Sequence, residues 1–372
     1  MRNIRGLTLD IGGSELRAKP YGLAEKTCIP NECATILQEN FRFKPTDDPI
    51  GCCEIIEAPR KEYEGYIAVG SVGRSYPSEN IALSTGEPKT AQGNYYKQML
   101  YMIAREALAE SERCGFNTVS PQVDRIGYVL SVCIPIREHS GREDCSSKLK
   151  SKLVGDYVVR FPLFESPRYV RFTLKSSWIG VVPEGGVAMT ALRKSVDQDT
   201  LSLIIDVGEV TTDIALFKGK SLYGDKVVSV SWAGRTLSSN IRMALNDAGY
   251  VLAQSDVQDV IKTGRVRLGV DEVSVVEIIQ AEKKNFVRNY LQEEILNLLN
   301  ANKIIPTQIH NVIPIGAVMN ASAGMPPLYD YILDDCNLRF AKVYELADDL
   351  RYVNISQAET YTELLLRAAR ED

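Results

Sequence analysis

The segment SLIIDVGEVTTDIALFKG (residues 202–219) repeats the pattern of GLTLDIGGSELRAKPYG (residues 6–22). Each reads as an apolar strand that ends in an aspartate, followed two residues later by a glycine, a small or hydroxylated turn and a second strand. Asp10 and Asp206 hold the same place in the two copies. Two strands joined by a short turn with glycine predict a β-hairpin. We therefore expect the same hairpin twice, each copy opening one half of the chain.

Both turns carry groups that suit phosphate. The backbone N–H groups of a turn that follows a buried strand point outward, and glycine lets the backbone approach phosphate oxygens closely. A carboxylate at the strand end suits Mg²⁺, held through the water that this ion releases reluctantly. The candidate residues are Asp10, Gly12, Gly13, Ser14, Glu15 and Arg17 in the first turn, and Asp206, Gly208, Glu209, Val210, Thr211 and Asp213 in the second. One such turn is more often a plain hairpin, but two copies would bind the phosphates of one nucleotide from both sides.

The rest of the sequence alternates helices with strands, which is the pattern of an α/β protein. Hydrophobic period and run length predict the elements. They are helices over 94–111 and 273–300, buried strands over 124–136 and 311–316, and a strand, a turn and a helix start over 179–194. The C-terminal helix is expected to begin after Ser356, with Glu359 three residues later completing a capping box.

At 372 residues the chain is long for one hydrophobic core, so two domains are expected. The first comprises residues 1–192 and 350–372, and the second comprises residues 193–349. An irregular subdomain rich in proline, glycine and charge is expected at about 30–92, within the first domain.

The composition excludes several classes of protein. Hydrophobic residues make up 45% and charged residues 24% of the chain, as in ordinary globular proteins. No apolar run approaches the roughly 20 residues that cross a bilayer, and the N-terminus lacks the apolar core of a signal peptide. A net charge of −5 argues against direct binding to nucleic acid, and 8 scattered cysteines with 2 histidines argue against a zinc site. We expect a cytoplasmic protein with reduced cysteines and no membrane association.

In order and spacing, these motifs resemble the actin-like ATPase superfamily and, within it, the plasmid-segregation actins of the ParM (StbA) type. The first phosphate motif of that superfamily is a D-x-G hairpin with a basic residue seven positions after the aspartate, here Arg17. The second is D-x-G-x-x-T-x-D, which residues 206–213 match. The adenosine motif is an apolar strand ending in Gly-Gly, and NVIPIGAVMNAS is similar to it, with Gly316 and Ala317 at that place.

Further segments carry the resemblance and extend the candidate site. IGVVPEGGVAMTAL (residues 179–192) looks like the ParM-type connecting motif, in which a glutamate positions the attacking water; that role would fall to Glu184. Gly234 is expected either to make a strand-to-helix turn or to lie on the ribose side of a nucleotide. Lys283 is expected either to flank the adenine or to lie on a solvated helix face, and Trp232 is expected in the core.

The resemblance implies an α/β fold of two actin-like domains, duplicated ribonuclease-H-like domains around a nucleotide cleft. It implies ATP as ligand, with GTP as the alternative, and Mg²⁺ held through water by Asp10 and Asp206. Glu184 and Asp206 would be catalytic, hydrolysing ATP to ADP and phosphate. The protein would polymerise with Mg-ATP into filaments that segregate plasmid DNA. Its partner would be a small adaptor of the ParR type on a centromere-like plasmid site, without direct contact to nucleic acid.

Three positions depart from the superfamily pattern. Arg17 replaces the usual lysine and brings a bulkier, planar cation. Ala317 adds a methyl group where the adenosine turn is usually bare. Glu209 places a carboxylate in a phosphate-binding turn, where it would repel phosphate if desolvated and unpaired. Its side chain is therefore expected either to turn away, leaving only its N–H for phosphate, or to reach the metal shell.

Two other functions use the same hairpin pair. Sugar and acetate kinases transfer the γ-phosphate to a small molecule, which requires an acceptor pocket with a general base. A nucleotide-gated scaffold binds ATP with little hydrolysis. Light scattering and phosphate release with Mg-ATP separate both from a segregation filament.

Overall fold

The computed structural model describes residues 3–42, 48–77, 83, 87–139, 144–192, 196–223, 227–253, 256–269, 271–322 and 324–371. The chain divides into two compact units, Met1–Glu184 with Ile355–Asp372 and Gly185–Asn354. Residues 185–192 and 350–354, which the sequence assigned to the first domain, group with the second unit. Each unit is described below by itself.

The first unit is built on a mixed sheet with the strand order β3-β2-β1-β7-β9-β8-β5-β6-β4, and β10 also pairs with β7. Its strands are β1 (Ile4–Ile11), β2 (Glu15–Pro20), β3 (Thr27–Pro30), β4 (Ala34–Ile36), β5 (Cys52–Glu57), β6 (Gly65–Ala68), β7 (Arg125–Ile134), β8 (Gly155–Phe161), β9 (Arg168–Leu174) and β10 (Ile179–Pro183). Its helices are α1 (Ser71–Arg74), α2 (Gly93–Arg113), α3 (Ile136–His139), α4 (Cys145–Leu153) and α10 (Val353–Glu371), which belongs to this unit from Ile355 onward.

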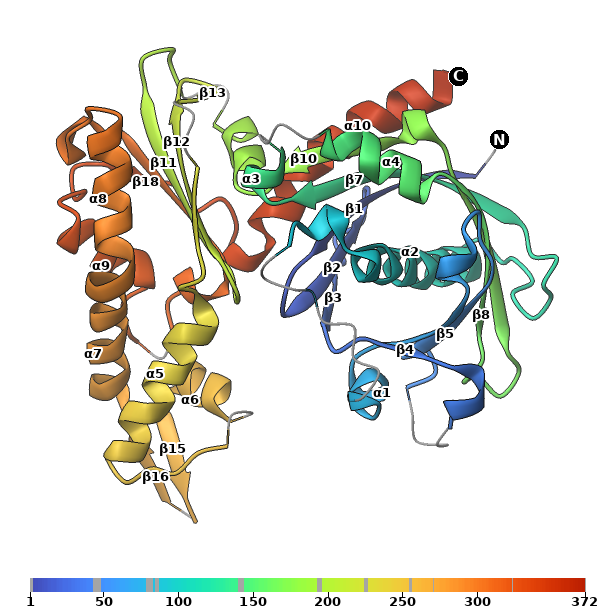
Figure 1. The fold of residues 1–372 in the computed structure, drawn as a ribbon, viewed down its shortest axis with the longest axis horizontal. Helices are drawn as coiled ribbons and strands as arrows, with labels where there is room; N and C mark the ends of the chain where they lie inside the picture. Colours follow the sequence, from blue (N-terminus) through green and yellow to red (C-terminus); the bar gives the residue numbers. More distant parts are fainter. Residues whose placement is uncertain are drawn as a thin grey trace. The chain divides into compact units, whose positions relative to one another are not determined.

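Strand β1 separates two layers of this unit. Side chains alternate between the faces of a strand. Leu7 and Leu9 lie in the main core with α2, around which the sheet curls (Figure 1). On the opposite face, Thr8 shares a buried hydrogen bond of 2.8 Å with Thr362 of α10. A Cβ on Gly6 would lie 2.8 Å from the Thr362 side chain, so the absence of a side chain there lets α10 approach the sheet.

The second unit has a smaller sheet with the order β13-β12-β11-β17-β18, and β14 pairs with β12. Its strands are β11 (Leu201–Val207), β12 (Thr212–Lys218), β13 (Ser221–Leu222), β14 (Val228–Val230), β17 (Asn311–Ile315) and β18 (Lys342–Val343), with a separate ribbon of β15 (Arg265–Leu268) and β16 (Asp271–Ser274). Its helices are α5 (Gly234–Asp247), α6 (Val257–Thr263), α7 (Val276–Phe286), α8 (Gln292–Ala301) and α9 (Leu328–Asp335).

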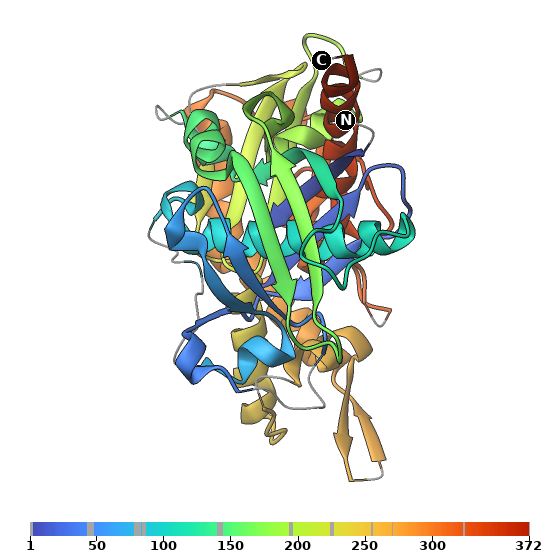
Figure 2. The same cartoon turned by 90° about the vertical axis from the view of Figure 1, so that its right-hand side faces the viewer.

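The two sheets repeat one arrangement. In each, an antiparallel hairpin (β1–β2 or β11–β12) is followed in the sheet by a parallel strand (β7 or β17) and then by another parallel strand (β10 or β18). Figure 2 shows the paired strands β8 and β9 of the first unit, in green, side by side. The expectation of two similar α/β halves, each opened by the same hairpin, is therefore confirmed.

Three expected details differ from the structure. Residues Gly186–Thr190 form a 3₁₀ turn where a helix start was expected; residues 193–195 lie outside the described part. The helix expected over 273–300 begins at Val276 and contains a π-helical turn at Val287–Leu291. Ser356 is not the N-cap of α10, which begins at Val353 because a 3₁₀ turn, Leu350–Tyr352, leads directly into it.

Among the described residues, no helix is both long enough and apolar enough to span a bilayer.

Candidate functional site

The two hairpins match residue for residue. Asp10 lies opposite Arg17 across β1 and β2, and Asp206 lies opposite Asp213 across β11 and β12. Both loops close in the same way, because the N–H of Gly12 donates to Glu15 O at 2.9 Å and that of Gly208 to Thr211 O at 3.0 Å. Equal registers and equal closing bonds make Glu209 the counterpart of Gly13 and Val210 the counterpart of Ser14.

Both loops also leave little room for a side chain at their first glycine. A Cβ on Gly12 would lie 3.0 Å from Glu15 O, and one on Gly208 would lie 3.1 Å from Thr211 O. These separations are below ordinary van der Waals contact, so glycine permits the tight turn in both copies. The sequence reading of both turns as glycine-dependent agrees with this geometry.

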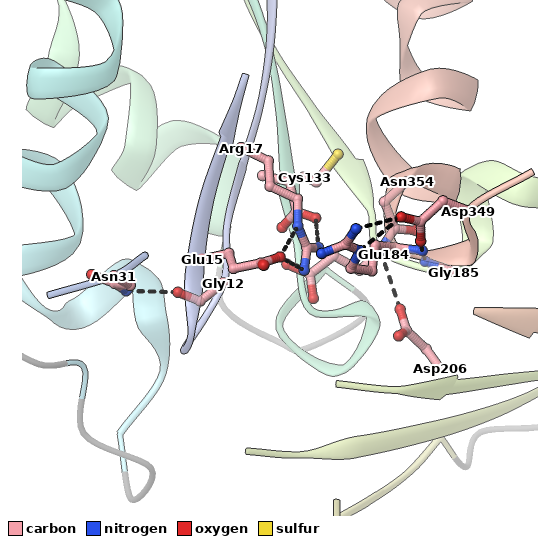
Figure 3. Close-up of polar contacts among 12 residues, drawn as sticks. Gly12, Glu15, Arg17, Asn31, Cys133, Glu184, Gly185, Asp206, Asp349 and Asn354 are labelled. Atoms are coloured by element: carbon pink, nitrogen blue, oxygen red, sulfur yellow. Dashed lines mark hydrogen bonds and ion pairs between the residues drawn. The ribbon is translucent and has the colours of Figure 1, made fainter. Parts of the chain in front are cut away.

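Arg17 is held by two carboxylates in the first unit (Figure 3). Its Nη1 donates to Asp10 Oδ2 at 3.1 Å, and its Nη2 donates to Glu15 Oε2 at 2.9 Å. Burial alone would lower the pKa of the Arg17 guanidinium, but the charges of Asp10 and Glu15 raise it above its ordinary value. A permanent cation thus lies beside the loop.

Asn31 braces the first loop from the next strand connection. Its Nδ2 donates to Gly12 O at 2.7 Å (Figure 3). Its backbone N–H donates to Ser14 O at 2.7 Å. Its Oδ1 accepts a bond of 2.9 Å from Gln98 of α2. The carbonyl groups of Gly12 and Ser14 are thus both bonded to Asn31, and Gly13 between them is exposed.

Glu184 follows β10 and is paired with a lysine. Its Oε1 accepts a bond of 3.0 Å from Lys89 Nζ, and the two side chains are 11% and 20% exposed. Its backbone N–H donates to Ile134 O at 2.7 Å, which continues the pairing of β10 with β7. The proposed water-positioning glutamate therefore lies at a fixed place in the first unit.

In the second unit, Asp206 is bound by an amide at the start of α10. Asn354 Nδ2 donates to Asp206 Oδ2 at 3.1 Å, and Asn354 Oδ1 accepts from the N–H of Gly185 at 2.8 Å (Figure 3). Asn354 is 4% exposed, and its bond to Asp206 is partly buried. Asp213, 8% exposed, places a second carboxylate directly across the hairpin from Asp206. Like charges at facing positions disfavour the pairing, and a cation near them would offset that cost.

The second loop is bonded to the first turn of α5. The N–H of Gly234 donates to Gly208 O at 2.9 Å, and the N–H of Arg235 donates to Glu209 O at 2.8 Å. A Cβ on Gly234 would lie 3.1 Å from Glu209 Oε2, so the Glu209 carboxylate lies against the N-terminus of α5. That helix end carries partial positive charge and favours an anion. Gly234 therefore makes a close strand-to-helix turn.

Trp232 corrects an expectation. It was assigned to the core, but it is 43% exposed and packs on Tyr290 with ring centroids 4.9 Å apart. Its carbonyl accepts a bond of 2.6 Å from Thr212 Oγ1, next to the second loop. Its ring therefore packs against the π-helical turn that holds Tyr290 and stays partly exposed to solvent.

Gly316 ends β17 in a conformation reserved for glycine. Its φ is +106°, and a Cβ there would lie 2.1 Å from Val207 O, which is incompatible with any side chain. Its N–H donates to Leu350 O at 3.1 Å. Ala317 begins the following 3₁₀ turn and is exposed, so its methyl group is accommodated without strain.

Lys283 does not lie on a solvated helix face, which was one of its two expected positions. It is 1% exposed, and its Nζ makes two long contacts of 3.4 Å, to Ser322 Oγ and Pro326 O. Burial lowers the pKa of Lys283 to about 8. The alternative, contact with an adenine, stays a prediction.

The residues of both loops fit a phosphate ligand with a magnesium ion. Each loop offers a glycine cradle and an aspartate at the strand end, and the first adds a guanidinium. Within the described part of the chain, no three His, Cys, Asp or Glu side chains gather to chelate a metal. An ion held by Asp10 or Asp206 would therefore draw on phosphate oxygens and water, as Mg²⁺ usually does.

Solved structures share the fold of this chain. The actin-like protein Alp7A aligns over 99% of both chains at 13% identity, with a TM-score of 0.71. The chain has the actin-like fold. An archaeal actin homologue aligns over 97% of this chain and 99% of its own at 16% identity, with a TM-score of 0.67. Bacillus thuringiensis ParM with AMPPNP aligns over 97% and 99% at 14% identity, with a TM-score of 0.66. No protein-family model and no curated protein sequence matches the chain.

The structure of this actin-like chain adds residues that the sequence did not indicate. Asn31 bonds to the first loop, Asn354 bonds to Asp206, and Lys89 bonds to Glu184. None belongs to a motif, and each meets its partner only through the tertiary fold. Lys89 follows a segment without hydrophobic period, so no local signal would have identified it.

Proposed function

We propose that this actin-like protein is an ATPase that assembles into filaments with Mg-ATP and segregates plasmid DNA. The observation that carries the proposal is the pair of matched loops, with Asp10 and Asp206 at the same register and the same closing bond at Gly12 and Gly208. An unrelated hairpin has no reason to repeat all of these features. The likeness to ParM and Alp7A structures supports the segregation role.

In this proposal both loops bind the phosphates of ATP through backbone N–H groups, with Ser14 and Thr211 adding hydroxyl groups. Asp10 and Asp206 would hold Mg²⁺ through water, which would neutralise phosphate charge. Phosphoryl transfer needs positioning and charge neutralisation more than covalent help. Glu184 would orient the attacking water.

Gly234, Lys283, Gly316 and Ala317 are proposed to line the nucleoside side of the same ligand. Among these residues, Lys283 is best suited to accept a further hydrogen-bond partner, because its two contacts of 3.4 Å are long. A purine nitrogen or oxygen would supply a shorter acceptor. ATP is proposed as the nucleotide, with GTP as the alternative.

The partner is proposed to be a small DNA-binding adaptor of the ParR type. A net charge of −5 argues against direct, nonspecific binding of the chain to DNA. The filament contacts would be head-to-tail and would not close into a ring.

Light scattering and phosphate release, recorded together after addition of Mg-ATP, test the proposal. Scattering that rises and then falls as phosphate appears is the expected result. Phosphate release without scattering at any protein concentration would instead favour a small-molecule kinase. Scattering that rises and persists without phosphate release would favour a nucleotide-gated scaffold.

A further inference from the structure

Lys89 and Glu184 form an ion pair that joins two distant segments of the first unit. Lys89 lies in the 3₁₀ turn Lys89–Ala91 just before α2, and Glu184 follows β10. The distance from Lys89 Nζ to Glu184 Oε1 is 3.0 Å, and both side chains are mostly buried. Pairs of this kind hold a carboxylate in one orientation, unlike exposed pairs, whose long side chains stay mobile.

The backbone of Lys89 is fixed by a third residue, Glu138 of α3. One oxygen of Glu138 accepts the N–H of Lys89 at 2.7 Å. Its other oxygen accepts the N–H and the hydroxyl of Thr90 at 3.1 and 3.0 Å. The hydroxyl of Tyr96 donates to Thr90 O at 2.6 Å, which ties the same turn to α2. The ammonium therefore starts from a rigid turn.

The backbone of Glu184 is equally constrained. Its N–H bonds to Ile134 O at 2.7 Å, one residue beyond the last paired position of β10 and β7. The carboxylate thus extends from the end of a sheet strand toward a cation on a bonded turn. Rotating it away would break the 3.0 Å contact with Lys89.

Three carboxylates act on the charge of Lys89. Glu184, Asp10 and Glu138 face it, from the end of β10, from β1 and from α3. Burial alone would lower the pKa of Lys89, but these carboxylates raise it above its ordinary value. Lys89 therefore stays an ammonium throughout the neutral range, and its charge is available to Glu184 at every working pH.

We propose that Lys89 is a positioning residue for Glu184. Lys89 keeps the Glu184 carboxylate ionised and in one orientation, and Glu138 in turn fixes the backbone of Lys89. The proposal rests on the role proposed above for Glu184 as the group that orients water. Lys89 acts through Glu184 and not through the substrate. Its loss should therefore change the turnover rate and the pH dependence, and leave the KM for ATP nearly as it is.

Two measurements on the full-length protein test this. The first is the titration of the Glu184 side-chain carboxyl by ¹³C NMR, assigned by its absence in Glu184→Gln. The second is the pH profile of phosphate release with Mg-ATP. Both are recorded for the wild type, Lys89→Gln and Lys89→Arg. Lys152→Gln is the matched control, because Lys152 pairs with Glu62 at 3.5 Å on the surface of the same unit.

In Lys89→Gln, the Glu184 titration should move up by about one pH unit or more, since an adjacent cation favours the ionised carboxylate. The acid limb of phosphate release should move by the same amount, and kcat should fall by about tenfold to a hundredfold through misplacement of the carboxylate. Lys89→Arg should keep the titration near the wild type but recover the rate only in part, because the planar guanidinium points differently.

An unchanged Glu184 titration in Lys89→Gln, or an equal shift in Lys152→Gln, would overturn the proposal. If the wild type releases no phosphate, the ATPase proposal fails, yet the NMR titration still decides whether Lys89 controls Glu184. If Lys89→Gln does not fold, Lys89→Arg decides instead: a full wild-type rate would show that only charge is required and that no orientation is imposed.

Discussion

The guanidinium of Arg17 donates twice to one carboxylate oxygen of Glu15, from Nε at 3.1 Å and from Nη2 at 2.9 Å. Arg17 and Glu15 lie on the same face of β2, two residues apart, where side chains repeat. The cation expected to meet a phosphate is thus already bound to a side chain of the same loop. A nucleotide would have to compete with Glu15 for it.

Replacing Glu15 by glutamine should strengthen nucleotide binding. An amide oxygen accepts a weaker bond from arginine than a carboxylate does, so Arg17 is released more easily to a phosphate. We expect the dissociation constant of Mg-ATP to fall about tenfold, which corresponds to about 1.4 kcal/mol. Isothermal titration calorimetry at constant salt measures this. Glu62→Gln removes a surface carboxylate of the same unit and should leave binding unchanged; equal or weaker binding in Glu15→Gln would refute the competition.

Gly316→Ala should destabilise the second unit severely. The alanine Cβ would lie 2.1 Å from Val207 O at a φ of +106°, so β11 and β17 would have to separate at their ends. We expect a loss of about 3 kcal/mol or more in the free energy of unfolding. Tryptophan fluorescence, to which Trp232 of this unit contributes, follows the transition in urea.

Gly249→Ala is the matched control for that substitution. Gly249 also has a positive φ, +91°, but a Cβ there would meet nothing within 4 Å. It should cost only about 1 kcal/mol, the price of the left-handed backbone alone. Similar losses at Gly249 and Gly316 would show that the close approach to Val207 has no energetic consequence.

Lys283 makes the stability of the second unit depend on pH. Its pKa is about 8 in the folded chain and 10.5 ordinarily, so between these values the unfolded chain binds the extra proton. Stability therefore rises with pH across this window and is reduced below about pH 8, where the buried amine is charged. The free energy of unfolding of the wild type relative to Lys283→Met should rise by about 2 to 3 kcal/mol from pH 7.5 to pH 10.

Urea unfolding of both proteins at several pH values, followed by tryptophan fluorescence, measures that difference. Lys284→Met is the control, because Lys284 is the exposed neighbour on the same helix and its loss should give no pH-dependent difference. A constant gap between wild type and Lys283→Met would show that Lys283 does not titrate in this window.

Asn354→Asp should weaken binding of Mg-ATP. The substitution keeps the shape of the side chain but replaces the amide that donates to Asp206 at 3.1 Å by a carboxylate that repels it. We expect about a tenfold loss of affinity, larger at low magnesium concentration. Asn311→Asp changes another buried asparagine of the same unit, bonded to Ser202 at 2.9 Å, and should affect stability without changing affinity. Equal affinities for the two variants would contradict the assigned role of Asn354.

The repeated hairpins were predictable because everything that makes them is local. The apolar alternation of β1 and β11, and the glycines at positions 12 and 208, lie within a single segment of sequence. The fold class followed from the same repeat, since strands and helices alternate after each copy. Tertiary contacts added detail without changing this plan.

The partners of the site were not predictable from such patterns. Lys89 meets Glu184, and Asn354 meets Asp206, from opposite ends of long stretches of chain. The misplaced cap at Ser356 has a similar origin: the side chain of Asp349 bonds to the N–H of Arg351 and starts a turn that extends the helix backward. Local capping rules do not include such a preceding turn.

The long α7–α8 helix is interrupted by a π-helical turn at Val287–Leu291, which holds one residue more than a regular helical turn. One extra residue in a helix rotates everything after it by about 100° relative to a regular helix. Lys283 in α7 and Ile295 in α8 are both buried, and a regular helix would set them about 120° apart; the extra residue of the π-helical turn reduces this angle to about 20°. Deleting a single residue within this turn would give a regular helix that keeps the two sides in line, whereas a regular helix of the present length would leave one of them without its present neighbours.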